Sequence, residues 1–172
     1  MKNLLLKPLN KFGLIHEITP TSVGWNYVGM AIHLLKPGDL ISGLTKQTEV
    51  IIVIVEGKCE LNINNTMFGE LGERTSVFER LPPQSVYASI NSQWSCKAVS
   101  VCTIAVCSAP GKGNHKAKLL DPPVLTQRGK GSNTRFINNI AMENDDVADS
   151  LLVTEVFTPE GNWSSYPPHR HD

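Results

Sequence analysis

The sequence predicts an all-β protein, an antiparallel sandwich or barrel, and three observations support this. Short apolar segments are separated by Gly, Pro and Asn at fairly even spacing, as in double-sheet β proteins. Residues 50–55 form an unbroken run of Val and Ile, which is typical of a strand buried on both faces. No segment has a sustained apolar period of 3.6 residues, so we expect no long amphipathic helix.

The expected strands follow one another through the first 107 residues. After residues 50–55, Glu56-Gly57-Lys58 forms a turn, and a second strand over 59–63 ends at the turn pair Asn64-Asn65. Further strands are expected over residues 75–81 and 85–90, which Pro82-Pro83 separates, and over 99–107. In the last of these the alternation places one set of side chains on a single face, namely Val99, Val101, Thr103 and Ala105.

Composition excludes several classes of protein. The 16 basic and 16 acidic residues balance, which gives no support for a nucleic-acid partner or a membrane surface. The apolar run near the start is too short for a signal peptide, so the cytoplasm is the expected location. The cysteines have no C-x-x-C spacing and are expected to be buried free thiols, with Cys102 and Cys107 facing opposite ways; they are Cys59, Cys96, Cys102 and Cys107.

A change in amino-acid composition near residue 110 predicts the domain organisation. Residues 111–149 are polar and rich in Gly and Pro, with a basic first part and an acidic patch at Glu143, Asp145, Asp146 and Asp149. A strand pattern resumes over residues 151–157. We therefore expect a complete domain over 1–110, a crossing segment over 111–149, and the first strands of a second domain over 150–172.

The chain ends on His169-Arg170-His171-Asp172, a pattern that suits a metal site. Residues two apart on a strand share a face, so the imidazoles of His169 and His171 could bind one ion. Protein-bound metals normally have three or four ligands, so the site is expected to be interrupted. A flexible tail is the alternative interpretation. The other histidines, His16, His33 and His115, are isolated and are expected to have surface or structural roles.

The basic stretch over residues 112–135 could attract an anionic substrate. Arg128 and Arg135 are the better candidates, because they flank a Gly- and Asn-rich stretch that is not expected to form regular structure, and arginine binds carboxylates in a bidentate way. The alternative is that these are ordinary solvated charges. The Gly-x-Gly pairs at 111–113 and 129–131 lack a third glycine and do not indicate a dinucleotide site, and no G-x-S-x-G pattern occurs.

Five segments carry a resemblance to a known family. The chain resembles the 5-deoxy-glucuronate isomerases of myo-inositol catabolism, which are related to the 4-deoxy-uronate ketol isomerases of pectin breakdown. The segments are 25–29 (WNYVG), 68–78 (FGELGERTSVF), 105–111 (AVCSAPG), 128–135 (RGKGSNTR) with 138–139 (NN), and 156–172 (VFTPEGNWSSYPPHRHD). The resemblance implies a bicupin, two jelly-roll β-barrels in one chain, which agrees with the predicted strands.

The resemblance also implies which barrel holds the metal. In such a family a divalent metal ion lies in the C-terminal barrel, and His169 and His171 would be its first two ligands, with a Glu and a further His that have no counterpart here. In the N-terminal barrel Glu49 stands where a metal-binding cupin would have a ligand, but no histidine accompanies it at 44–49 or 83–88. The first barrel is therefore expected to be a metal-free scaffold.

The implied reaction is an aldose–ketose isomerisation of 5-deoxy-glucuronate to 5-dehydro-2-deoxy-gluconate, with no catalytic base assigned and with Arg128 or Arg135 on the substrate carboxylate. This chain is expected to be an incomplete form of the enzyme. The apolar strand over 151–157 is expected to lack sheet partners and to pack on the first barrel or on another copy, giving a homodimer or other homo-oligomer. The alternative function is a non-catalytic cupin module that binds a small acid or mediates assembly.

Overall fold

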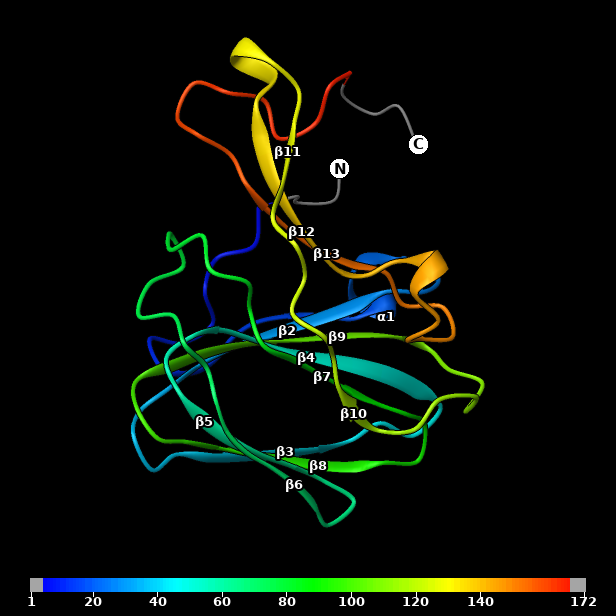
Figure 1. Cartoon of the computed structure of the whole chain (residues 1–172). Helices are drawn as coiled ribbons and strands as arrows, with labels where there is room; N and C mark the ends of the chain where they lie inside the picture. Colours follow the sequence, from blue (N-terminus) through cyan, green and yellow to red (C-terminus); the bar gives the residue numbers. More distant parts are fainter. Residues whose placement is uncertain (1–4, 168–172) are drawn as a thin grey trace.

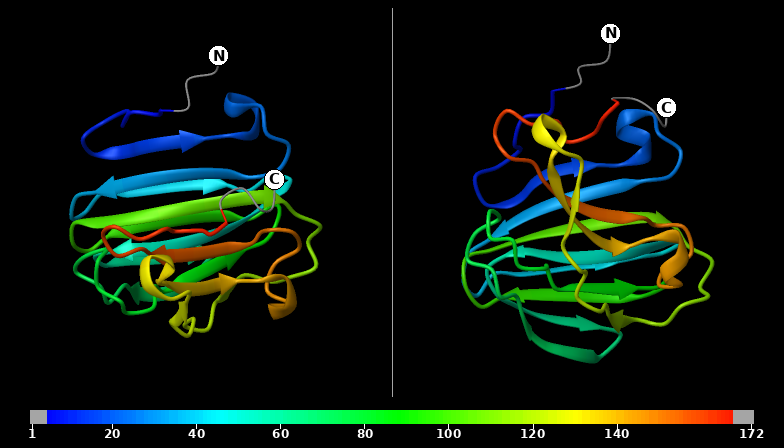
Figure 2. Two further views of the ribbon diagram at one scale, coloured as in Figure 1. Left: turned by 90° about the horizontal axis from the view of Figure 1, so that it is seen from above. Right: turned by 45° about the horizontal axis from the view of Figure 1, so that its top comes forward.

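The computed structural model describes residues 5–167, and it confirms the prediction of an all-β protein with antiparallel sheets. The arrangement of two cupin barrels in one chain remains a prediction. Three antiparallel sheets form three layers (Figure 1). A four-stranded and a six-stranded sheet face each other and enclose the first core, and a three-stranded sheet lies over the outer face of the six-stranded one. Two further views show the same stacking (Figure 2). Within residues 5–167, no helix is long and apolar enough to cross a membrane.

The first barrel contains ten strands and one short helix. The six-stranded sheet has the order β1-β2-β9-β4-β7-β10 and the four-stranded sheet has the order β3-β8-β5-β6. The bounds are β1 Gly13–Ile18, α1 Pro20–Val23, β2 Gly29–Leu35, β3 Leu40–Leu44, β4 Thr48–Glu56, β5 Cys59–Ile63, β6 Thr66–Leu71, β7 Ser85–Ala88, β8 Gln93–Ala98, β9 Cys102–Pro110 and β10 Lys118–Leu119.

Strand β4 explains the unbroken apolar run of the sequence. Its residues Val50, Ile52 and Ile54 point into the core between the two barrel sheets. Ile51 and Val53 point the other way, into a second core beneath the three-stranded sheet. Because each face of β4 is covered by a different sheet, both sets of side chains are apolar, as the run predicted.

The three-stranded sheet has the order β11-β12-β13 and continues the chain after the barrel. Its elements are β11 Thr126–Arg128, the 3-10 turn η1 Gly131–Asn133, β12 Arg135–Ala141, the 3-10 turn η2 Glu143–Asp145 and β13 Val153–Phe157. The expectation that residues 151–157 lack sheet partners is wrong, because β13 pairs with β12. The expected packing on the first barrel is confirmed, since Leu151 and Val153 join the second core.

Three strand predictions need correction. Residues 75–81 form a loop rather than a strand, because Ser76 and Glu79 close a turn through their backbone groups. The strand expected over 85–90 ends at Ala88, and the one expected over 99–107 begins at Cys102. The stretch between Arg128 and Arg135 does have regular structure, a tight 3-10 turn between paired strands.

Other local predictions are confirmed. Asn64 and Asn65 both have positive φ (51° and 66°), the backbone that a two-residue β5–β6 hairpin requires. All four cysteines are free, and Cys102 lies in the first core while Cys107 packs against the second. Burial raises the pKa of the Cys107 thiol to about 11, so the thiol stays protonated near neutral pH. The proposed domain boundaries remain a prediction.

Candidate functional site

The two faces of the three-stranded sheet differ in what they contact. The strand registers place one set of residues toward the first barrel: Phe136, Asn138 and Ile140 of β12, and Val153, Glu155 and Phe157 of β13. Burial follows this alternation along β13, since Val153 is buried and Glu155 and Phe157 are half-buried, whereas Thr154 and Val156 are exposed. The other side of the sheet, which we call the open face, points away from the barrel.

The open face is predominantly polar. The register pairs Arg128 with Arg135, Thr126 with Ile137, Ile137 with Val156, and Asn139 with Thr154. Successive rows of side chains on one face of a strand are about 6.7 Å apart. The open face therefore presents two arginines at the hairpin end, an apolar row next to them, and an amide with a hydroxyl beyond.

Arg128 and Arg135 lie directly opposite each other on neighbouring strands. Residues so paired have Cβ atoms about 4.5–5.5 Å apart, and two like charges in this arrangement repel each other. Arg135 Nη1 donates to the Asn133 carbonyl oxygen at 3.1 Å. Within residues 5–167 no carboxylate forms an ion pair with either guanidinium. The pair therefore suits an external anion, and the sequence identified both residues although it missed the strands that hold them.

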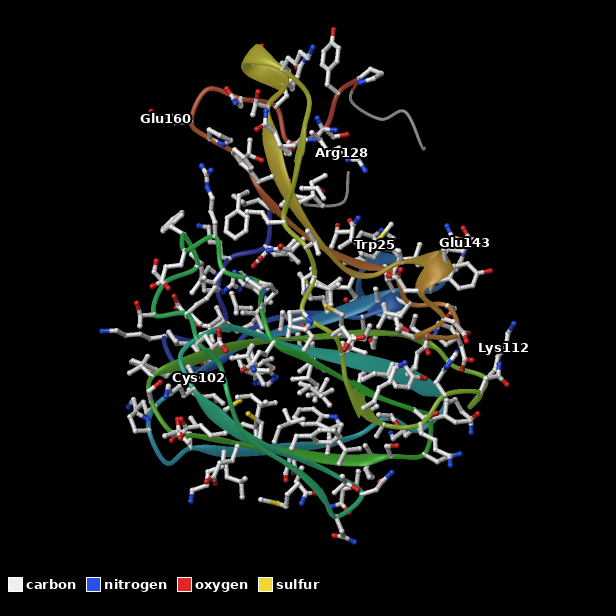
Figure 3. All side chains as sticks on the ribbon, viewed as in Figure 1. Trp25, Cys102, Lys112, Arg128, Glu143 and Glu160 are labelled. Atoms are coloured by element: carbon white, nitrogen blue, oxygen red, sulfur yellow. The ribbon has the colours of Figure 1, made fainter. Side chains whose placement is uncertain are left out.

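The hairpin of these arginines also holds the segment that leads to the two histidines. The Trp163 N–H donates to the Ser132 carbonyl oxygen at 2.8 Å, and Asn162 Nδ2 donates to the Thr134 carbonyl oxygen at 2.8 Å. Figure 3 shows Arg128 at the hairpin end of the sheet, far from the first barrel. His169 and His171 themselves lie outside the described residues.

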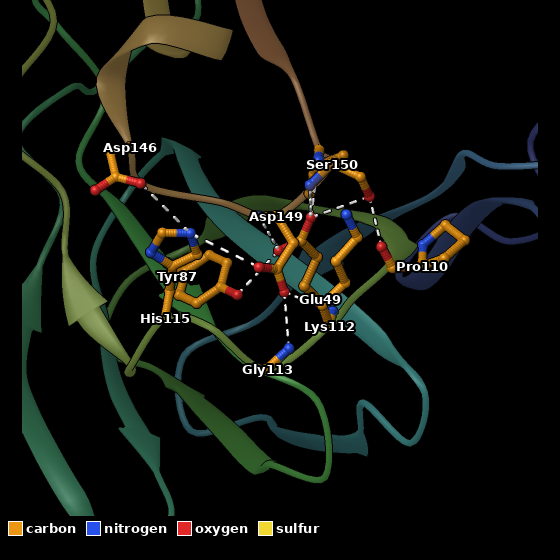
Figure 4. Close-up of polar contacts among 10 residues, drawn as sticks. Glu49, Tyr87, Pro110, Lys112, Gly113, His115, Asp146, Asp149 and Ser150 are labelled. Carbon is orange, nitrogen blue, oxygen red and sulfur yellow. Dashed lines mark hydrogen bonds and ion pairs between the residues drawn. The ribbon is translucent and has the colours of Figure 1, made fainter.

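The described residues do not assemble a metal site. Among residues 5–167 no three His, Cys, Asp or Glu side chains are placed to share one ion. Glu49, which the resemblance placed at a cupin ligand position, is fully buried and accepts hydrogen bonds from the Tyr87 hydroxyl and from the backbone N–H groups of Asp149, Ser150 and Leu151, at 2.7–2.9 Å (Figure 4). The carboxylate of Glu49 therefore binds the backbone of the segment that precedes β13.

Asp149 extends this cluster toward the loop after β9. Its Oδ2 accepts the N–H groups of Lys112 and Gly113 at 2.5 and 2.8 Å, and its Oδ1 lies 3.7 Å from His115 Nε2. Burial alone would raise the pKa of Asp149, but these hydrogen bonds hold the pKa below its ordinary value. Burial and the hydrogen bond to Glu49 raise the pKa of Tyr87. The histidine that the sequence marked as isolated therefore belongs to a polar cluster.

A second buried polar cluster joins the barrel to the sheet. Arg74, in the loop after β6, donates to both carboxylate oxygens of Glu155 at 2.8 and 2.9 Å, and Asn138 Nδ2 donates to the same carboxylate at 3.0 Å. Arg74 lies within residues 68–78, one of the segments that carry the family resemblance, but the sequence alone indicates no role for it. Eighty-one positions separate it from Glu155, and no local pattern links two residues so far apart.

Comparisons with known proteins identify the family. A family model described as KduI/IolB matches residues 4–172. The chain is 44% identical over 165 residues to a 5-deoxy-glucuronate isomerase of Geobacillus kaustophilus, covering 95% of this chain and 59% of that protein. It is 38% identical to the protein of the same name from Bacillus subtilis strain 168, covering 100% and 66%.

A solved structure agrees with this. The crystal structure of an IolB-like protein from Salmonella typhimurium LT2 matches with a TM-score of 0.92 at 38% identity, covering 96% of this chain and 64% of that one. The chain thus spans about three-fifths of the length of two curated relatives that it matches at 43–44% identity. On the family match and these identities, the chain belongs to the KduI/IolB family.

Proposed function

We propose that this chain contributes to the isomerisation of 5-deoxy-glucuronate to 5-dehydro-2-deoxy-gluconate. The observation that carries the proposal is its 44% identity, over 95% of its length, to a protein named 5-deoxy-glucuronate isomerase. The substrate is a linear sugar acid with an aldehyde at one end and a carboxylate at the other. We propose that Arg128 and Arg135 bind the carboxylate.

The open face supports this orientation of the substrate. A guanidinium pair with no carboxylate partner in the described chain gains most from an anionic ligand, which relieves the repulsion between the two charges. The apolar row next to the pair can contact the deoxygenated carbon, which neighbours the carboxylate. The amide of Asn139 and the hydroxyl of Thr154 can hydrogen-bond substrate hydroxyls farther along the sugar chain.

The reaction moves one proton between carbons and one between oxygens, and it keeps the oxidation balance within the substrate. A base removes the proton from C2, beside the aldehyde, and an enediolate forms. A proton is then delivered to C1 and the proton of the C2 hydroxyl passes to the former aldehyde oxygen, so the aldehyde becomes an alcohol and C2 becomes a ketone. The acid end is then numbered first in the product. Because the carboxylate does not react, the arginines would bind substrate and product alike and would mainly set their affinity. We assign no catalytic base.

A divalent metal ion remains part of the proposal through His169 and His171 alone. When bound, such an ion would polarise the carbonyl oxygen and stabilise negative charge on the enediolate. Residues 5–167 contain no group of three His, Cys, Asp or Glu side chains that could hold the ion. Metal content of the purified chain, with and without His169→Ala, tests these two ligands, and unchanged content in the variant would remove them from the proposal. We also propose a cytoplasmic location and a homo-oligomeric state.

Proton transfer in heavy water tests the isomerase activity directly. We expect the chain, incubated with 5-deoxy-glucuronate in D2O, to convert the aldehyde signal in the proton NMR spectrum into that of a ketose, with deuterium at the new CH₂OH carbon. Equilibrium binding of the substrate should be measured on the same preparation. Absence of both turnover and binding would refute the proposal, whereas binding without turnover would favour the non-catalytic module.

Arginine variants test the proposed carboxylate contact. Arg128→Ala and Arg135→Ala should each weaken substrate affinity by roughly tenfold or more, because a charge-assisted hydrogen bond to the carboxylate is lost. Lys130→Ala is the matched control, since it removes the same charge from the turn of the same hairpin but outside the paired strand positions. If all three variants weaken binding equally, the arginines act only through the general positive field.

A further inference from the structure

The loop that carries Arg74 is fixed at its base to the first barrel. The Gly57 N–H donates to the Arg74 carbonyl oxygen at 2.8 Å, and the Gly72 N–H donates to the Gln84 side-chain oxygen at 2.6 Å. Gly72 has φ +109° and its α-carbon leaves no room for a side chain, since an added Cβ would lie 2.0 Å from the Gly57 carbonyl oxygen. The backbone thus holds Arg74 in one position before its side chain makes any contact.

The side chain of Arg74 then reaches the three-stranded sheet. It is 2% exposed and its two Nη atoms bind the two oxygens of Glu155, whose own side chain is 20% exposed. Bidentate pairing of a planar guanidinium with a carboxylate fixes orientation as well as distance, which a lysine cannot do. Asn138, directly opposite Glu155 in the register, donates to the same carboxylate from β12. One arginine of the barrel therefore contacts a residue of β13 that is itself bonded to β12.

The same loop contacts the sheet a second time. The Arg80 guanidinium lies 3.9 Å from the centre of the Phe136 ring, on the barrel-facing side of β12. β13 is an edge strand in the described chain, with β12 as its sheet neighbour. Its placement against the barrel thus depends on side-chain contacts, and the Arg74–Glu155 pair provides a bidentate one at the middle of the strand.

We propose that Arg74 is a positioning residue for the open face, and the proposal rests on the function proposed above. Glu155 alternates with Thr154 and Val156, which lie on the open face, and Asn138 alternates with Ile137 and Asn139. Arg74 contacts Glu155 on the barrel side of the sheet and fixes the position of β13 relative to β12. The positions of the open-face residues on these two strands, Arg135 among them, then depend on Arg74. Arg74 does not touch the substrate itself.

Paired variants at Arg74 test the inference by ligand affinity. D-glucuronate, a stable uronic acid, serves as the probe, with its affinity measured by calorimetry well below the unfolding temperature of each variant. Arg74→Met should weaken binding by about tenfold or more, because small displacements of a binding site are costly, and Arg74→Lys should recover part of the loss. Lys58→Met is the control, since it removes a cation from an exposed pair with Glu70 at the same 2.8 Å distance.

Hydrogen exchange provides the second measurement. Amide exchange in β13 should accelerate in Arg74→Met and change little in β1 of the same protein, or in β13 of the control. Unchanged affinity in a folded Arg74→Met variant would overturn the inference and leave Arg74 a purely structural residue. If the wild-type chain binds no glucuronate, the proposed recognition of this uronic-acid probe by the open face fails, and the exchange rates alone then decide whether Arg74 positions the sheet: unchanged rates overturn the inference.

Discussion

The two faces of the three-stranded sheet use their charged residues in opposite ways. On the barrel side, Glu155 is half-buried and has partners in both Arg74 and Asn138. On the open side, Arg128 and Arg135 face each other with no carboxylate partner in the described chain. A buried charge must be compensated by a partner within the protein, because its desolvation is costly. An exposed charge is solvated by water and remains available to bind a ligand. The charges of the barrel side thus have a structural role, whereas those of the open side fit the recognition role proposed for them.

Removing the charge of Glu155 should give the largest loss of stability. Glu155→Ala leaves the Arg74 guanidinium buried without its counter-ion, and loss of one partner of a buried pair typically costs about 3–5 kcal/mol of unfolding free energy. The measurement is urea unfolding followed by tryptophan fluorescence. Glu70→Ala, which breaks an exposed pair, should cost about 1 kcal/mol or less. Equal losses in the two variants would show that burial of the pair does not matter.

Glu49→Gln should give the next largest loss, at the other end of β13. An amide oxygen can still accept from one or two of the backbone N–H groups of residues 149–151, but its NH₂ group would face these donors. We expect a loss of about 2–3 kcal/mol, the cost of a buried hydrogen-bonding group left unpaired. Glu60→Gln, on an exposed position, is the control. A loss below about 0.5 kcal/mol would mean that the Glu49 cluster contributes little to docking of the sheet.

Sequence patterns predicted the structural features that depend on residues close together in the chain. The β4 run, the β5 strand and the Asn64-Asn65 turn were all found, because apolar periodicity and turn chemistry act over a few residues. The loop over 75–81 was wrongly taken for a strand. Its hydroxyl and carboxylate groups form local turn bonds, among them those from Thr75 to Glu79, and these outweigh the β propensity of its Val and Phe.

The candidate site was predicted in part for the same reason. Arg128 and Arg135 were chosen because they flank a Gly- and Asn-rich stretch, but their pairing across two strands became visible only in the fold. The structural roles of Arg74 and Glu49 were missed because their partners lie 81 and about 100 positions away. A charge is interpreted from the sequence as solvated unless its partner is nearby, so buried long-range pairs are the contacts that pattern analysis fails to find.

The dependence of the unfolding free energy on pH in the acidic range should change when Asp149 is substituted. The pKa of this carboxyl is lowered in the folded protein, so its contribution to stability is fully present above its unfolded pKa, about 3.9, and is lost as pH falls through the lower folded value. Asp149→Asn should therefore be less stable than the wild type at pH 7, and the difference should shrink toward pH 2. Unfolding midpoints in urea across this range measure it, with Asp121→Asn, at an exposed position, as the control. A pH-independent difference would mean that shape, rather than charge, sets the role of Asp149.

Substitutions on the open face should change stability least of all. Arg128 is exposed and Thr154 is exposed, so Arg128→Ala and Thr154→Ala should shift the unfolding free energy by no more than about 0.5 kcal/mol. Arg128→Ala should even be neutral or slightly stabilising, because it removes the repulsion from Arg135 across the hairpin. The same variant should weaken binding of a uronic acid. A residue whose removal leaves the fold intact and lowers affinity acts in recognition, whereas a loss of stability comparable to that of Glu155→Ala would place Arg128 among the residues that hold the sheet together.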